Sequence, residues 1–288
     1  MTKSTLQQEA AVRHYLATGD HEPGFLGWPG SNFLDAAQRG SAILCDALLA
    51  EVASRTRLQG IASGPVNPDV TALARSKISP MVAGLFTVAE QPMVLAMLER
   101  SVVFLHPGNI ESVLRSARWS HTAWSLANLY LVSVGCERLS DEAPNIVGLS
   151  EETTCYVSPA YFSSQNGFAD YIVHEAAHVF HNCKRATVGL KETRRRDFLL
   201  DIDYEKRETF AYACEAYSCM VARDGNAAGR RAALAAHADS SLPGDDSVDL
   251  DEYLDILREA VEARNGWKRI LQRCAPRESR AAPRPIPG

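Results

Sequence analysis

The sequence is organised around one stretch, Tyr171-Ile-Val-His-Glu-Ala-Ala-His-Val-Phe-His181. Within it, His174 and His178 are four residues apart, so on an α-helix they lie one above the other on the same face. Two imidazoles placed in this way can converge on one tetrahedral zinc ion. Glu175 lies about 100° around the helix from His174. There it stands beside the ion, where it can take a proton from a zinc-bound water. The stretch therefore predicts a helix with two zinc ligands and a general base.

A zinc ion bound in this way needs a third ligand, and a downstream segment offers three candidates. Residues 201–220 are helical by composition and contain Glu205, Glu208 and Glu215. Glu208 and Glu215 fall on one helical stripe with the small residue Ala211, which lets a second helix approach closely. Glu205 stands among tyrosine, lysine and arginine and is expected to face solvent. Glu208 is favoured as the ligand because its neighbours are apolar. Glu215 stays open, either as the ligand or as an acid that orients a histidine.

His181 is a rival for the third position, because it follows His178 by three residues and shares its face. A third ligand normally comes from a separate element, which favours a supporting or surface role for His181. The segment that follows, residues 184–196, is basic. It is interpreted as a solvated loop, and the alternative is a rim that attracts acidic substrate side chains.

The two helices together resemble those of the gluzincin group of zinc metallopeptidases. His174-Glu-x-x-His178 is followed thirty residues later by Glu208. The run Glu208-Thr-Phe-Ala-Tyr-Ala213 is similar to the third-ligand helix of the anthrax lethal factor type of peptidase, where Glu-x-Phe-Ala-x-Ala surrounds that ligand. The resemblance implies that His174, His178 and Glu208 hold Zn²⁺ and that Glu175 is the general base. The group often has a tyrosine or histidine that stabilises the oxyanion, and the nearby candidates are Tyr204, Tyr212 and Tyr217.

The segments before the motif predict an α+β, mostly helical fold. Residues 101–106 and 153–158 are short runs rich in β-branched and aromatic residues, typical of strands. A long helix is predicted from Asn109 to Leu129, and the motif helix from about Phe168 to Lys184. This order is expected of a zincin-like core with a small mixed sheet and two metal-bearing helices. The strand nearest the motif helix is expected to offer an edge on which a peptide lies extended.

Three regions follow from the pattern along the chain. Residues 1–100 form a helical N-terminal region and residues 101–274 a zincin-like metallopeptidase domain. Residues 275–288 form a Pro- and Arg-rich tail with too little apolar surface to fold. Further helices are predicted at 6–17, 33–56 after Ser31 as N-cap, 69–78, 81–88, 92–100, 230–238 and 249–274.

Composition is that of an ordinary globular protein, with 46% hydrophobic and 23% charged residues. The net charge of −5 gives no support to a nucleic-acid or membrane-surface role. The first residues lack the apolar core of a signal peptide, and no run of about 18 apolar residues predicts a membrane span. Seven scattered cysteines favour reduced thiols in a cytoplasm. Secretion without an N-terminal signal stays open, and the sequence does not define an oligomeric state.

The leading hypothesis is a zinc-dependent metallopeptidase that hydrolyses peptide bonds of a protein or peptide substrate. The alternative is a zincin-fold binding or regulatory protein without turnover. A third hypothesis treats the motif as accidental, with His174 and His178 packed in a helical core. In that case neither Glu175 nor Glu208 should approach the histidines within coordination reach.

Overall fold

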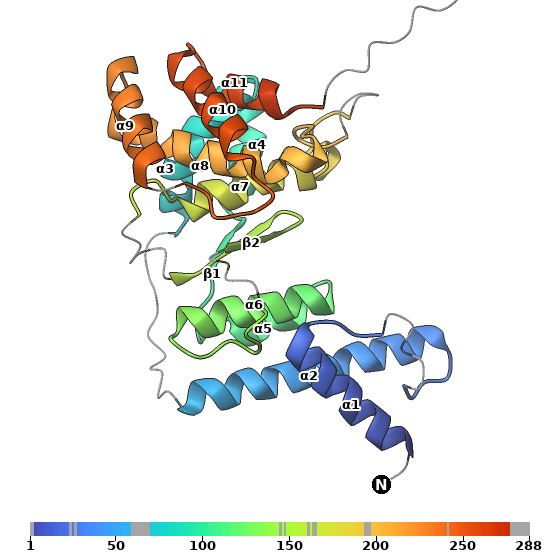
Figure 1. Cartoon of the computed structure of the whole chain (residues 1–288). Helices are drawn as coiled ribbons and strands as arrows, with labels where there is room; N and C mark the ends of the chain where they lie inside the picture. The colour runs from blue at the N-terminus through green and yellow to red at the C-terminus, as the bar shows by residue number, and fades with distance from the viewer. Residues whose placement is uncertain are drawn as a thin grey trace, which may run out of the picture. The chain divides into compact units, whose positions relative to one another are not determined.

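A computed structural model describes residues 3–22, 25, 28–58, 70–143, 146, 148–159, 162, 166–192, 197–240 and 242–276 (Figure 1). These residues form eleven α-helices and three short strands, which confirms the predicted α+β, mostly helical class. The helices are α1 (Lys3–Thr18), α2 (Phe33–Leu58), α3 (Val70–Leu85), α4 (Gln91–Leu98), α5 (Ile110–Ser116), α6 (Ser120–Ser133), α7 (Tyr171–Asn182), α8 (Arg207–Arg223), α9 (Ala227–Ser240), α10 (Leu250–Glu262) and α11 (Gly266–Cys274). The strands are β1 (Val102–Phe104), β2 (Gly148–Glu151) and β3 (Thr154–Val157). Within the described residues, no helix is both long and apolar enough to cross a membrane.

The chain divides into two compact units, and each of them is built from two separate segments. The first unit comprises Met1–Val70 and Val102–Ser164, and the second comprises Thr71–Ser101 and Gln165–Gly288. The junction between Ser101 and Val102 lies one residue beyond the predicted boundary between residues 100 and 101. Each unit, however, contains one segment from either side of this junction. Of the predicted tail, residues 275–288, those from 277 onward lie outside the described residues.

Two ion pairs explain why α3 and α4 belong with the motif helix. Lys77 of α3 lies 2.8 Å from the carboxylate of Asp170, the residue that precedes α7. Glu90, at the start of α4, pairs with Arg185, which lies beyond the end of α7. Both contacts join residues far apart in sequence, so the spacing of motifs along the chain does not reveal them.

The first unit combines α1, α2, α5 and α6 with the three-stranded sheet (Figure 1). The strand order is β1-β3-β2, with β1 parallel and β2 antiparallel to β3. Helix α2 packs against both α1 and α6. The largest fully buried side chains of this unit are Tyr15, Leu44, Leu48, Leu105, Leu114 and Leu126.

The structure confirms the two predicted strands and adds β2, which sequence patterning missed. Gly148-Leu-Ser-Glu151 has neither β-branched residues nor a clear alternation, so its strand character comes from pairing with β3. The connecting turn places Glu152 at a φ of 51°. Because β3 is paired on both sides, the prediction that this strand offers a free edge to a peptide is wrong. A central strand has no free backbone groups for an added peptide.

The structure divides or joins several of the predicted helices differently. The helix predicted over 109–129 is two helices, because Ala117 takes a ψ of 130° and leaves the helical conformation between α5 and α6. Helix α3 continues through Pro80 instead of restarting there, held by the buried neighbours Ile78 and Met81. The helix predicted over 249–274 is interrupted at 263–265, where Asn265 caps α11.

The second unit surrounds α8, which contacts α7, α9, α10 and α11 (Figure 1). Phe180 of α7 and Phe210 of α8 are fully buried, and the Phe180 ring meets that of Phe86 at 5.1 Å. Burial of two such rings on adjacent helices supplies a large apolar contribution to folding. The pair α7–α8 is therefore a packed element of the core, and it carries the motif.

The Glu90–Arg185 pair gives a test of how the second unit is held together. Only 15% of the Glu90 side chain and 7% of the Arg185 side chain are exposed. Replacing Glu90 by Ala leaves a buried, uncompensated guanidinium, which should lower the free energy of unfolding by about 3–5 kcal/mol. Urea unfolding followed by tryptophan fluorescence measures this change. The matched control is Glu262→Ala, which breaks an exposed pair with Arg231 and should cost less than about 1 kcal/mol.

The same pair predicts a pH dependence with a defined sign. Burial alone would raise the pKa of Glu90, but hydrogen bonds from Arg185 and Thr87 hold it below its ordinary value. A carboxyl with a lowered pKa stabilises the fold above its unfolded-state pKa and loses that contribution as the pH falls through the lowered value. The difference between wild type and Glu90→Ala should therefore shrink below about pH 4. An equal difference at pH 3 and pH 7 would contradict this account.

Candidate metal centre

Helix α7 begins where its first turn is capped. The Asp170 carboxylate accepts a hydrogen bond from the backbone N–H of Val173, at 3.4 Å. The helix ends at Asn182, since Cys183 is extended, so it is shorter at both ends than predicted. Its apolar face is fully buried and consists of Ile172, Val173, Ala176, Ala177, Val179 and Phe180. Burial of this face fixes the rotation of α7 and hence the direction of its histidines.

Helix α8 presents the predicted stripe of residues to α7. Ala211 is fully buried, and its small side chain allows the two helices to approach closely. Tyr212 meets the His174 ring at 4.5 Å in an edge-on arrangement. Glu208 and Glu215 lie on the same stripe, one turn before and one turn after this contact, and both reach motif histidines.

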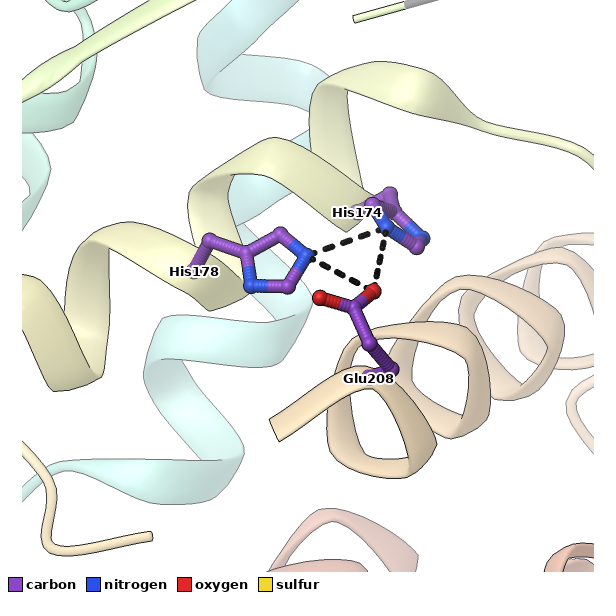
Figure 2. Close-up of side chains that lie close together, drawn as sticks. All are labelled: His174, His178 and Glu208. Atoms are coloured by element: carbon purple, nitrogen blue, oxygen red, sulfur yellow. Dashed lines mark hydrogen bonds and ion pairs between the residues drawn. The ribbon is translucent and has the colours of Figure 1, made fainter. Parts of the chain in front are cut away.

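The structure brings together the three residues predicted as ligands (Figure 2). His174 Nε2 and His178 Nε2 are 3.1 Å apart. Glu208 Oε2 lies 3.4 Å from His178 Nε2 and 3.8 Å from His174 Nε2. In Figure 2 the two rings on α7 and the carboxylate on α8 point at one another. Among the described residues, these three are the one group of histidine, cysteine or carboxylate side chains that lie close enough together to hold a metal ion.

These distances fit the dimensions of a zinc site. Zinc binds histidine nitrogen and carboxylate oxygen at about 2.0–2.1 Å, and a tetrahedron of that size has edges of about 3.3–3.4 Å. The three measured edges of 3.1, 3.4 and 3.8 Å bracket this value. Two imidazoles with one carboxylate are also a donor set that zinc accepts, with a fourth position left for water. Side-chain exposure of 39% at Glu208 leaves that side of the site accessible.

Glu215, the rival carboxylate, takes the orienting position. Its Oε2 lies 3.1 Å from His174 Nδ1, on the opposite side of the ring from the atom that faces Glu208. Its Oε1 accepts a hydrogen bond from the backbone N–H of Asp170, at 2.7 Å. A carboxylate held at both oxygens fixes the tautomer and the ring plane of the histidine, as around metal ligands in general. In the structure Glu208 therefore faces both Nε2 atoms, and Glu215 faces His174 Nδ1.

His181 supports the other motif histidine in the same way. Its Nε2 lies 3.1 Å from His178 Nδ1, and its own Nδ1 lies 3.1 Å from the side-chain oxygen of Asn182. If His178 Nε2 binds a metal ion, His178 Nδ1–H would donate to His181 Nε2, and His181 Nδ1–H would donate to the side-chain oxygen of Asn182. The supporting role favoured for His181 from its spacing agrees with this geometry.

The buried charges of the site influence one another strongly. Burial alone would lower the pKa of His174, but the hydrogen bond and charge of Glu215 raise it to about 9. Burial raises the pKa of the Glu175 carboxyl, and the charges of His174 and His178 oppose this increase. Burial would likewise raise the pKa of Glu208, but the nearby histidines bring it below its ordinary value. Glu208 therefore favours the ionised form that a ligand needs.

The remaining sequence candidates lie away from the metal position or have structural roles. Glu205 is exposed, as predicted. Tyr204 is 80% exposed, and Tyr217 packs against Trp267 at 4.9 Å, so of the three tyrosines Tyr212 is the one in contact with a motif histidine. In the basic segment 184–196, Arg185 is buried against Glu90. Residues 193–196 lie outside the described residues.

Sequence reasoning missed one supporting contact, the Lys77–Asp170 pair. Asp170 joins the cap of α7 to Glu215, and Lys77 neutralises its carboxylate. Burial raises the pKa of Asp170, and Lys77 opposes that increase. An acidic residue just before the motif helix is a recognisable N-cap signal. Lys77 has no comparable signal, because it lies 93 residues earlier in the chain than Asp170.

Comparison with protein-family models, curated proteins and solved structures gave no significant match. The interpretation of the site therefore depends on its own geometry and chemistry.

The roles of the three acids predict a rank order of zinc affinities. Glu208→Gln removes a negatively charged ligand and should weaken zinc binding most. Glu215→Gln keeps the size of the side chain, but an amide cannot accept from both His174 and the Asp170 N–H, so affinity should fall by about 10–100-fold. Glu205→Gln is the matched control and should bind zinc as the wild type does. Competition with a chromophoric chelator measures all three, and a larger loss for Glu215→Gln than for Glu208→Gln would exchange the two roles.

Proposed function

We propose that the chain is a zinc-dependent metallopeptidase. The observation that carries the proposal is the convergence of His174 Nε2, His178 Nε2 and Glu208 Oε2 at 3.1–3.8 Å, with Glu175, the residue after His174, buried on the same helix. When bound, zinc would polarise the carbonyl of the cleaved bond and acidify the attacking water. The accidental-motif hypothesis requires that neither Glu175 nor Glu208 approach the histidines, and the Glu208 distances argue against it.

Glu175 is proposed to move the protons of the reaction. Its carboxylate takes a proton from the attacking water and later delivers it to the leaving amine nitrogen. Burial raises the pKa of this group, which makes it a better proton acceptor than an exposed glutamate. Glu215 and His181 hold the two imidazoles in place and take no part in proton transfer to the substrate.

Peptide rather than another amide is proposed as the substrate on the resemblance to the gluzincin group. A cytoplasmic location is proposed from the seven cysteines, all of which are thiols in the structure, five of them buried. Nothing in the charge of the chain favours a nucleic-acid partner.

Glu175→Gln tests the proposed chemistry. The variant should bind about one zinc per chain, as the wild type should, because Gln fills the same volume and Glu175 is not a ligand. Cleavage should fall by at least about 100-fold, since a general base is lost. The readout is the set of new protein N-termini that wild type and variant each produce in a proteome digest, so no particular substrate has to be chosen. Glu205→Gln should cleave as the wild type does.

Two outcomes would contradict the proposal in different ways. Zinc that stays absent after refolding with excess zinc would remove the metal centre itself. Bound zinc with no new N-termini from the wild type would favour the alternative, a binding or regulatory protein without turnover.

Tyr212 is proposed to stabilise the oxyanion of the transition state. Its ring contacts His174, and burial raises its pKa to about 12, so the hydroxyl keeps its proton at neutral pH and can donate it. Tyr212→Phe should lower kcat by about 10²–10³-fold with little change in KM or zinc content. Tyr217→Phe removes a hydroxyl elsewhere on α8 and should leave kcat unchanged. An unchanged kcat in Tyr212→Phe would exclude this role.

A further inference from the structure

Arg207 is a cation beside the metal centre without an ionic partner in the described chain. It is the first residue of α8 and directly precedes Glu208. Its guanidinium lies over the exposed ring of Tyr204, at 5.1 Å from the centroid. Its Nε–H is buried and meets no hydrogen-bond acceptor among the described residues. The fold therefore holds a desolvated, charged donor and leaves it unsatisfied.

Other arginines of the second unit are satisfied differently. Six of them pair with carboxylates, namely Arg75, Arg185, Arg231, Arg258, Arg269 and Arg273. An exposed guanidinium without a carboxylate is hydrated, but a buried N–H without an acceptor costs free energy. Such a group in a site is expected to meet its acceptor in a ligand that arrives from solution.

Arg207 lies at the start of α8, directly before the proposed ligand Glu208, whose carboxylate lies 3.4 Å from His178 Nε2. Glu208, although adjacent in sequence, turns its carboxylate to the two motif histidines and makes no ion pair with Arg207. A ligand group bound by Arg207 would therefore lie next to the metal position and need not displace a ligand.

We propose that Arg207 binds a carboxylate of the substrate close to the bond that is cleaved. The inference rests on the proposed peptidase function and names its substrate class: peptides with an acidic side chain or a free C-terminal carboxylate at that position. A guanidinium binds a carboxylate through two parallel N–H donors. The Tyr204 ring lies over one face of the guanidinium, so a carboxylate would meet the donors at its edge. Arg185, the other arginine described near the end of α7, is committed to Glu90.

Four pools of hexapeptides with neutral randomised positions test the proposal. Two pools differ only in one Glu replaced by Gln, and two differ only in a free C-terminal carboxylate replaced by a carboxamide. Wild-type, zinc-loaded protein should cleave one of the carboxylate pools with a kcat/KM at least about tenfold higher than its neutral counterpart. The pool that shows the preference identifies the source of the carboxylate. The preference should appear in KM, because the carboxylate is bound in both ground and transition states.

Arg207→Gln should abolish the preference while zinc content and cleavage of the neutral pools persist. Arg207→Lys keeps the charge without the two-donor geometry and should restore part of it. The control Arg264→Gln removes an exposed arginine between α10 and α11 and should keep the full preference. Equal cleavage of all four pools, or a preference that survives in Arg207→Gln, overturns the inference and leaves the peptidase function intact. Absence of both zinc and cleavage in the wild type overturns the two together.

Discussion

The contact between His174 Nδ1 and the Glu215 carboxylate is the interaction on which the rest of the site depends. It joins α7 to α8, and it turns His174 Nε2 toward His178 and Glu208. A buried carboxylate is stable only when its charge is compensated and its oxygens accept hydrogen bonds. Here the Asp170 N–H supplies the second bond. The same residue caps α7, so the beginning of the helix and the position of its first histidine are fixed together.

The two motif histidines are supported by different chemistry. His174 has a carboxylate partner, which raises its pKa, whereas His178 has a neutral partner in His181. A carboxylate behind a ligand makes the imidazole more basic, and a neutral acceptor fixes the ring without adding charge. With Glu208 as the proposed third ligand and Glu175 next to His174 in the chain, a carboxylate in place of His181 would add a further acid to the site. The neutral support limits this repulsion.

Much of the site could be predicted from the sequence, because its key relations are local to two helices. The i, i+4 histidines and the stripe of Glu208, Ala211 and Glu215 depend only on helical periodicity. The residues favoured Glu208 over Glu215 but left both open, since both lie on the same stripe and the choice depends on how far α8 is shifted along α7. Lys77 joins the site from another segment, and its role depends on tertiary packing. In the fold, β2 gains its structure from pairing with β3, and α3 and α4 join the motif helix through contacts that no local pattern encodes.

The central claim is that His174, His178 and Glu208 hold one zinc ion. X-ray absorption spectroscopy at the zinc edge, on the full chain loaded with one equivalent of zinc, tests it most directly. The account predicts only nitrogen and oxygen neighbours at about 2.0–2.2 Å, with outer-shell scattering from two imidazoles. Because the chain has seven cysteine thiols, thiolate binding is the main competing result. Sulfur neighbours at about 2.3 Å, or a first shell without imidazole scattering, would contradict the account.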